Sequence, residues 1–366
     1  LGTRDATNGF CLFSDDPIEK DLEHYLEPLA KLCDVISKWE TALREKGSGK
    51  FENSRVIQLS YKNRLYWKHT IKCETDKERL LLCYQTNSQI VQGRFPLSRE
   101  LALELASLMS QIDMGDYSLE KSRDVGVGLK GLDKFYPYRY RDALGAEQLK
   151  DVQELLVSKW MLLKGRSTLD CVRIYLTCCR KWPYFGACLF QAKPRQNPES
   201  NAASGATPVA WLAVAEDALN VLELSTMAPV ARYPYSSVMT FGGCQDDFML
   251  VVSHDDGGGC EQKLLFAMSK PKILEITLLI ADYMNALGHT VPGTPQMNSL
   301  TRNGSHRSLR TSQRPTLGGG SAVFSTNATT TAHNTLNSHA THTLNSNHSH
   351  TLSSSHHAGG GSQPGT

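Results

Sequence analysis

Two short patterns in this sequence have the spacing of known chemical sites, and the first is rich in glycine. Residues Gly126-Val-Gly-Leu-Lys-Gly131 match the G-x-G-x-x-G loop, which binds a pyrophosphate where a strand leads into a helix. That loop needs a strand directly before it, whereas residues 120–124 read Glu-Lys-Ser-Arg-Asp. The sequence therefore predicts a loop between helices here, without a nucleotide.

The second pattern joins Cys73 to Arg79 in a C-x5-R frame, in which a thiolate attacks a phosphate that the arginine holds. The five residues between them are Glu, Thr, Asp, Lys and Glu. Their carboxylates would repel a phosphate dianion and disfavour the thiolate. Thr75 and Glu78 instead have the spacing of a helix capping box. The pattern predicts the start of a helix and no nucleophile.

The other candidates for catalysis are histidines and acidic pairs. His24, His69 and His254 are the histidines before position 289, and the sequence places no partner beside any of them. Acidic pairs such as Asp255-Asp256 lie in stretches of sequence typical of turns, where such pairs are usually solvated. The sequence has no Walker lysine motif, HExxH motif or EF-hand loop. It therefore predicts no catalytic residue, no metal and no cofactor, and thus no enzyme.

Composition and charge argue against further classes of function. The 366 residues exceed what one hydrophobic core usually serves. Residues from 289 onward carry four Arg and no acidic residue, so the 39 basic residues less these four leave 35 against 37 acidic ones. A near-neutral globular part argues against nucleic acid binding. No signal peptide or apolar run of about 18 residues occurs, which favours reduced cysteines in the cytoplasm. The leucine start is typical of a piece of a longer chain.

Four segments follow from the local patterns. Residues 1–72 contain short strands around one helix, and residues 73–182 contain several amphipathic helices, one of them starting at Ser167 with Asp170 three residues on. Residues 183–288 contain seven strand-like runs and a final helix from about Pro271. Residues 289–366 are a Ser/Thr/Asn/His-rich tail with nine of the twelve histidines, and we expect it to be disordered.

This order of segments, and specific text within it, resembles the FERM domain. The matching strings include KNRLYW, ETDKERLLLCYQTNSQIVQGRFPLSRELALELASLMSQ, RKWPYFGACLFQAK and KLLFAMSKPKILEITLLIADYMN. They are similar to the C-terminal FERM domain of the pleckstrin-homology-domain-containing family H proteins, in the myosin-tail homology/FERM group. The resemblance covers roughly residues 9–287.

The resemblance implies an α+β chain of three lobes: a partial ubiquitin-like lobe, a helical bundle, and a seven-stranded sandwich with a C-terminal helix, similar to pleckstrin-homology and phosphotyrosine-binding domains. It also implies a non-catalytic adaptor or scaffold between membrane proteins or anionic lipid and the cytoskeleton, at the cytoplasmic side of the plasma membrane. Its partners would be cytoplasmic tails or peptide motifs of membrane and adaptor proteins. An alternative is the targeting module of a larger signalling enzyme whose catalytic domain lies outside this chain.

The resemblance to phosphotyrosine-binding domains leads us to expect that a partner peptide adds as a strand at a sheet edge beside the last helix. We expect that edge at the fifth strand-like run, with the Gly242-Gly243 pair letting another backbone approach or making a bulge. A core role for the apolar members remains the alternative. The predicted groove consists of Val238, Met239, Thr240, Phe241, Gly242, Lys272, Glu275, Ile276 and Leu279.

A weaker expectation concerns anionic lipid, including a phosphoinositide membrane surface. Four basic residues, two in the first lobe and two at the start of the last helix, would form a surface where lobes one and three meet. These residues are Lys62, Arg64, Lys270 and Lys272.

Overall fold

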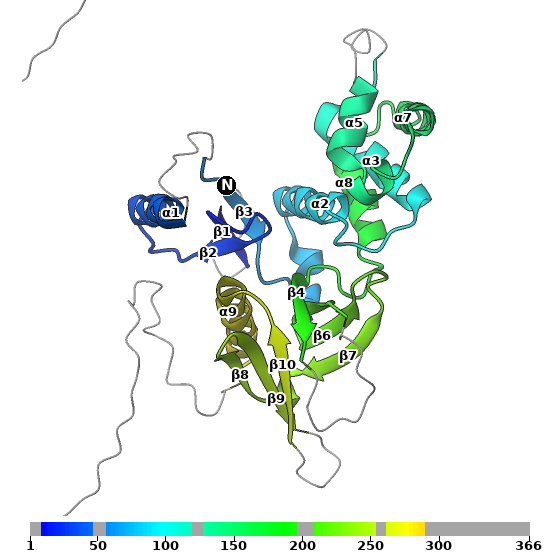
Figure 1. Ribbon diagram of the computed structural model, residues 1–366. Coiled ribbons are helices and arrows are strands. Elements are labelled where there is room, and N and C mark those ends of the chain that lie inside the picture. Colours follow the sequence, from blue (N-terminus) through cyan, green and yellow to red (C-terminus); the bar gives the residue numbers. More distant parts are fainter. Residues whose placement is uncertain (1–8, 47–55, 119–126, 196–207, 254–260, 290–366) are drawn as a thin grey trace, which may run out of the picture. The chain divides into compact units, whose positions relative to one another are not determined.

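The computed structural model describes residues 9–46, 56–118, 127–195, 208–253 and 261–289 (Figure 1). All the elements below belong to the first of two compact units, residues 1–299. The predicted disordered tail falls almost wholly outside the described residues, as does His254. None of the described helices has the length and apolar character needed to cross a membrane.

The first lobe, which we define as β1–β3 with α1, is a small antiparallel sheet with one helix, as predicted. The strands β1 (Phe10–Asp15), β2 (Glu23–Leu26) and β3 (Leu59–Asn63) lie in the order β2-β1-β3, and α1 spans Leu32–Lys46. Trp39 of α1 is 7% exposed, whereas Leu12 of β1 and Leu32 of α1 are 42% and 47% exposed. The lobe therefore leaves part of its apolar surface uncovered.

The second lobe, which we define as α2–α8, is a bundle of helices around a large apolar core. The capping box predicted at Thr75 and Glu78 is present, and Ser167 caps α8 by accepting the N–H of Asp170. Cys73 is exposed just before α2, and Arg79 pairs with Asp76 at 3.0 Å. The helices are α2 (Asp76–Val91), α3 (Arg99–Met114), α5 (Val127–Phe135), α6 (Tyr138–Arg141), α7 (Ala146–Met161) and α8 (Thr168–Cys179).

The prediction of a loop over residues 126–131 was wrong, because α5 begins at Val127. A Cβ atom at Gly131 would lie 3.1 Å from both Leu156 Cδ2 and Ser110 Oγ. The missing side chain lets α5 pack closely against α3 and α7. The glycine that imitated a nucleotide-binding motif is there for helix packing.

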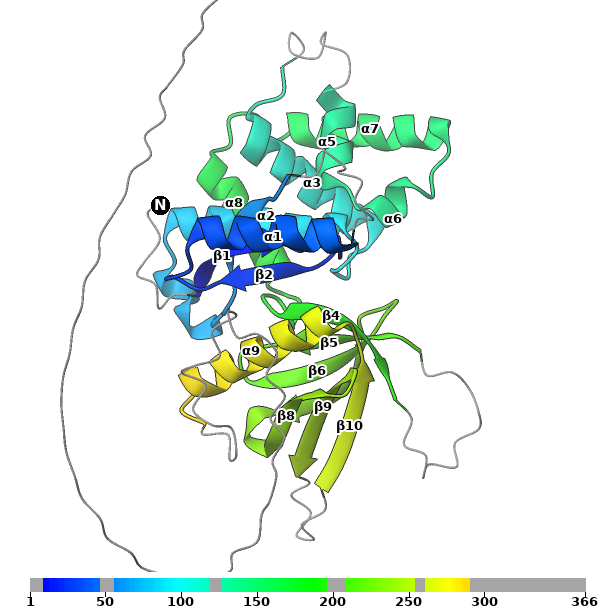
Figure 2. The ribbon, with the colours of Figure 1, turned by 60° about the vertical axis from the view of Figure 1, so that its left-hand side comes forward.

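The third lobe, which we define as β4–α9, contains the seven strands and the final helix that the sequence predicted. Its sheet has the order β7-β6-β5-β4-β10-β9-β8, and each described pairing is antiparallel. Ile276, Ile280 and Tyr283 of α9 are fully buried in one core with strand residues such as Leu250. The helix α9 lies against the sheet (Figure 2). The elements are β4 (Cys188–Pro194), β5 (Ala210–Val214), β6 (Ala218–Glu223), β7 (Pro229–Pro234), β8 (Val238–Cys244), β9 (Asp247–Ser253), β10 (Glu261–Ala267) and α9 (Lys270–Ala286).

Candidate partner-binding edge and interlobe contacts

Strand β8 is an end strand of the third-lobe sheet, as the sequence analysis expected. It pairs with β9 only, so the other side of its backbone faces no strand of the described sheet. Val238 pairs with Val252 and Thr240 pairs with Val251, which leaves Met239 as an extra residue in a β-bulge. Met239 is 40% exposed and Phe241 is half-buried against the lobe core.

The Gly242-Gly243 pair has a different role from the expected one. A Cβ atom at Gly243 would lie 3.3 Å from Ile273 Cγ2, and one at Gly242 would lie 3.9 Å from Thr277 Cγ2. Gly242 also has a φ of +142°, which side chains rarely tolerate. The two glycines therefore let α9 approach β8 closely, and the bulge is at Met239.

The predicted helix side of the groove was wrong. Ile276 and Leu279 are 0% and 3% exposed within the third-lobe core, so neither can meet a partner without unfolding the lobe. Glu275 and Lys272 point to the first lobe instead, where Lys272 pairs with Glu19 at 3.3 Å. Val238 of the strand side is also core, at 7% exposure. The side chains of α9 that border β8 are Ile273 and Thr277.

The four predicted lipid-binding cations do not form one open surface. Arg64 is 5% exposed and pairs with Asp282 of α9. Lys62 pairs with Glu23, and Lys272 pairs with Glu19. Lys270 is well exposed, but it pairs with Asp246 at 3.1 Å. Because each cation already has a carboxylate partner, the set carries little net positive charge toward a membrane.

His24 has the partners that the sequence could not place. Its Nε2 lies 2.7 Å from Asp16 Oδ2, and its Nδ1 lies 2.9 Å from Glu275 Oε1. Asp16 follows β1 in the first lobe, whereas Glu275 lies in α9 of the third lobe. The second contact joins residues 251 positions apart, which no local pattern in the sequence reveals.

The segment after β3, residues 64–68, contacts both other lobes. The backbone N–H of Tyr66 donates to the Tyr283 hydroxyl of α9, and the Tyr66 hydroxyl accepts from Arg180 Nε at 3.1 Å. Arg180 follows α8 and also donates to both oxygens of the buried Glu74 at 2.6 Å. The N–H of Lys68 donates to a carboxylate oxygen of the third lobe at 2.9 Å. These contacts position the three lobes around one short segment.

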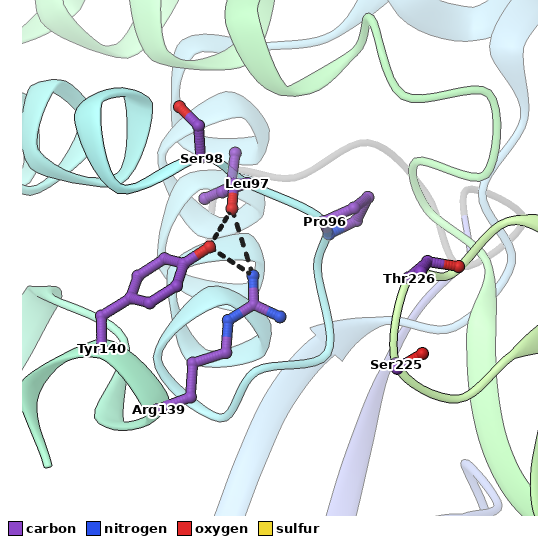
Figure 3. A pocket seen from close by; sticks show the side chains of 7 residues that line it. All are labelled: Pro96, Leu97, Ser98, Arg139, Tyr140, Ser225 and Thr226. Carbon is purple, nitrogen blue, oxygen red and sulfur yellow. Dashed lines mark hydrogen bonds between the residues drawn. The ribbon is translucent and has the colours of Figure 1, made fainter. Parts of the chain in front are cut away.

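A shallow pocket of about 400 Å³ lies between the second and third lobes (Figure 3). Arg139 points into it and donates to the carbonyl oxygens of Phe95 and Leu97, at 3.5 Å and 3.2 Å. The turn after β6 supplies the facing hydroxyls of Ser225 and Thr226, which donate to Glu223. Each of these polar groups is thus already hydrogen-bonded within its own lobe.

Three of the thiols that lie inside the lobes are held in the neutral form by burial. Burial raises the pKa of Cys83 and Cys179 far above the ordinary value of 9.0, and it raises the pKa of Cys188 to about 11. Within the residues that the structure describes, no group of three His, Cys, Asp or Glu side chains could hold a metal ion. The features suited to recognition are the free edge of β8 and the interlobe contacts.

The three lobes share their fold with solved FERM structures, and a family comparison identifies the second of them. The profile of the FERM central domain matches residues 68–190, which include the whole second lobe. Residues 68–190 are therefore a FERM central domain, and the resemblance seen in the sequence is confirmed at that level. The finer similarity to the pleckstrin-homology-domain-containing family H proteins stays a prediction.

Among curated proteins, the chain is 98% identical over 369 residues to uncharacterized protein CG43867 of Drosophila melanogaster, a match that covers 100% of this chain and 20% of that protein. Among solved structures, it matches the C-terminal MyTH4-FERM domain of human myosin 7b in complex with the harmonin-a PDZ3 domain. That match has a TM-score of 0.55 and 16% identity and covers 78% of this chain and 53% of the other.

The FERM domain of Drosophila Merlin, solved in complex with its C-terminal domain, matches with a TM-score of 0.52 and 14% identity, covering 76% of this chain and 83% of the other. At these identities the solved structures show a shared fold. The chain spans about a fifth of the length of protein CG43867.

Proposed function

We propose that this chain is a non-catalytic adaptor module that captures an extended segment of a partner protein by strand addition at β8. The observation that carries the proposal is the position of β8 at the end of the sheet, beside α9 and without a proline. An added strand would gain backbone hydrogen bonds along β8 and side-chain contacts with α9.

The opposite edge of the same sheet is protected against strand addition. Strand β7 begins with Pro229 and ends with Pro234, and neither residue has a backbone N–H to offer. Val230 of β7 lies in a bulge, as Met239 does in β8. The two edges therefore differ mainly in their prolines and in the neighbouring helix, and this difference favours β8 as the recognition edge.

The exposed apolar groups near β8 favour a partner segment with apolar side chains at alternate positions. Met239 is 40% exposed, and Thr277 presents a methyl group beside Gly242. Alternate side chains of an added strand point to the same face. One set would lie toward α9 and the other toward solvent.

The proposed cellular role is a link between membrane proteins and the cytoskeleton, at the cytoplasmic side of the plasma membrane. It is supported by the FERM central domain and by the shared fold with a myosin MyTH4-FERM domain. The partners would be cytoplasmic tails or peptide motifs of membrane and adaptor proteins. Because Lys62, Arg64, Lys270 and Lys272 are paired, a peptide is better supported as a partner than a phosphoinositide surface.

The alternative, a targeting module of a larger signalling enzyme, requires a catalytic domain in the rest of the protein. The chain covers 20% of protein CG43867, so most of that protein has no counterpart in this chain. Both readings share peptide capture at β8, and they differ in what the rest of the protein contributes.

Selection of a random peptide library on the intact chain, followed by titration calorimetry, tests the proposal. We expect selected peptides to shift the amide resonances of β8 and to lose at least tenfold in affinity, roughly one backbone hydrogen bond, in Met239→Pro. A bulge residue is the site in a strand that best tolerates proline.

Val230→Pro is the matched control, since it changes the bulge residue of the opposite edge strand. It should bind the same peptides with unchanged affinity, and both variants should keep the unfolding temperature within a few degrees of the parent. Equal binding by Met239→Pro and the parent would rule out the β8 edge.

A further inference from the structure

The contacts of His24 with two carboxylates depend on the protonation state of its imidazole ring. His24 lies in β2, an edge strand of the first-lobe sheet. Its ring nitrogens lie 2.7 Å from Asp16 Oδ2 and 2.9 Å from Glu275 Oε1. The side chains of Asp16 and Glu275 are 8% and 6% exposed, and that of His24 is 22% exposed. The three groups are thus largely shielded from water.

While Asp16 and Glu275 are both ionised, the charged imidazolium is the form of the ring that satisfies both contacts at once. A neutral imidazole has one N–H, so its other nitrogen would present a lone pair to a carboxylate oxygen at hydrogen-bonding distance. The imidazolium donates from both nitrogens, and each bond is then assisted by opposite charges. The observed distances therefore fit the protonated ring.

Glu275 is the third-lobe side of this contact and bonds to the first lobe twice. Its Oε1 meets the ring of His24, and its Oε2 accepts the backbone N–H of Tyr25 at 3.4 Å. The N–H of Tyr25 points away from β1, at the free edge of β2. One carboxylate of α9 thus joins the third lobe to both the side chain and the backbone of β2.

Two further charged groups lie near β2: Asp21, which pairs with Arg94 at 3.5 Å, and Glu27, whose charge acts on Tyr25. The other charged neighbours are paired with one another. They are Glu19 with Lys272, Glu23 with Lys62, and Asp282 with Arg64, whose guanidinium also lies 4.3 Å from the centre of the Tyr25 ring. Loss of the proton would therefore leave two shielded carboxylates with one N–H donor from the ring between them.

The stabilisation from Asp16 depends on pH in the opposite direction to that from His24. Burial alone would raise its pKa, but the hydrogen bonds from His24 and from the backbone N–H groups of Glu19 and Ile18 outweigh burial and hold the pKa below its ordinary 3.8. The stabilisation from Asp16 is therefore present above about pH 4 and is lost as the pH falls through its lowered pKa.

We propose that Asp16, His24 and Glu275 form a protonation-dependent clasp between the first and third lobes. The clasp is closed while His24 carries both protons and weakens as the pH rises through the titration of the ring. Flanking carboxylates favour the charged ring, so the midpoint should lie above about 6.5, the ordinary value for histidine. A cell compartment or local membrane surface that changes the pH by about one unit would then alter how firmly α9 is tied to the first lobe.

Hydrogen exchange of the Tyr25 amide in the intact chain reads this clasp directly, because that N–H donates to Glu275. We expect its protection factor to fall at least about tenfold between roughly pH 5.5 and pH 8.5, the equivalent of one hydrogen bond to a charged group. In Glu275→Gln the midpoint should move to lower pH, since one of the two flanking charges is removed.

His24→Gln should give low protection at Tyr25 with no dependence on pH, and His69→Gln, which changes a histidine outside the clasp, should keep the parent profile. Protection of amides in α3 reports whether each variant is folded. A Tyr25 profile that is flat in the folded parent, or unchanged in folded His24→Gln, would overturn the clasp. Peptide capture at β8 is a separate measurement and does not enter this result.

Discussion

The hydroxyl of Tyr283, on the last helix, accepts a hydrogen bond from the backbone N–H of Tyr66 over 2.9 Å, and the two residues are 217 positions apart. Tyr283 is fully buried and Tyr66 is 6% exposed. A polar backbone group that is sealed from water in this way depends on its one partner. The bond therefore fixes the segment after β3 against the third-lobe core, on which Leu65 and Trp67 also pack.

Tyr283→Phe should test that dependence, because it removes the acceptor and keeps the ring. The N–H of Tyr66 would be left buried without this partner, at a cost of about 1–3 kcal/mol in the free energy of unfolding. Urea unfolding measures the difference. Tyr138→Phe, which alters a tyrosine that is 44% exposed, should change the free energy by less than about 0.5 kcal/mol.

The pair formed by Glu74 and Arg180 should be worth more than any surface pair. Glu74 is 3% exposed and accepts from Arg180 Nη2 at 2.6 Å, so Glu74→Gln should destabilise the chain by about 3 kcal/mol. Asp217→Asn is the control, since Asp217 and Arg232 are each more than half exposed and their pair should contribute less than about 1 kcal/mol. Similar losses for both variants would contradict the argument from burial.

Gly186 and Gly165 separate a steric clash from backbone strain. Both have left-handed φ angles, +83° and +78°, so alanine should cost each about 1–2 kcal/mol. A Cβ atom at Gly186 would also lie 2.3 Å from the ring of Tyr66, whereas one at Gly165 would meet nothing within 4 Å. We expect Gly186→Ala to lower the unfolding temperature several degrees more than Gly165→Ala. Equal shifts would show that the Tyr66 ring moves freely.

Thiol labelling should follow burial. Cys33 and Cys73 are exposed and should react with iodoacetamide near pH 8, whereas Cys83 and Cys179, whose pKa values are raised by burial, should react only on unfolding. Labelling of Cys188 should increase as the pH approaches its pKa of about 11, where the thiolate forms. Mass spectrometry of the labelled peptides measures each site. Rapid labelling of Cys83 in the folded chain would contradict the buried core.

Local signals in the sequence predicted most of the elements. The seven strands of the third lobe and the caps at Thr75 and Ser167 depend on alternation and spacing within a few residues, and the structure contains all of them. Those signals act over one helical turn or one strand. They can be recognised in a single sequence because they depend on no distant residue.

Features that depend on distant residues were missed or misread. The periodicity of α9 identified its apolar stripe, but it did not show which residues of the helix face β8. Ile276 and Leu279 were therefore predicted to line a groove, whereas the structure buries both in the core. The partner of His24 lies 251 positions away. The helix around Gly131 exists because of its fit against Leu156, which glycine propensity alone opposes. Each case is decided by tertiary packing.

The short segment after β3 also bears on how the molecule would respond to force. Lys68 donates to Glu216, Tyr66 donates to Tyr283, and Arg64 pairs with Asp282, so three positions within five residues are anchored to the third lobe. A pull on the first lobe would load these bonds simultaneously, and bonds that share tension break less readily than bonds that are peeled apart in turn. Since forced rupture depends on the unfolding rate, the first and third lobes should act as one mechanical unit under brief loads.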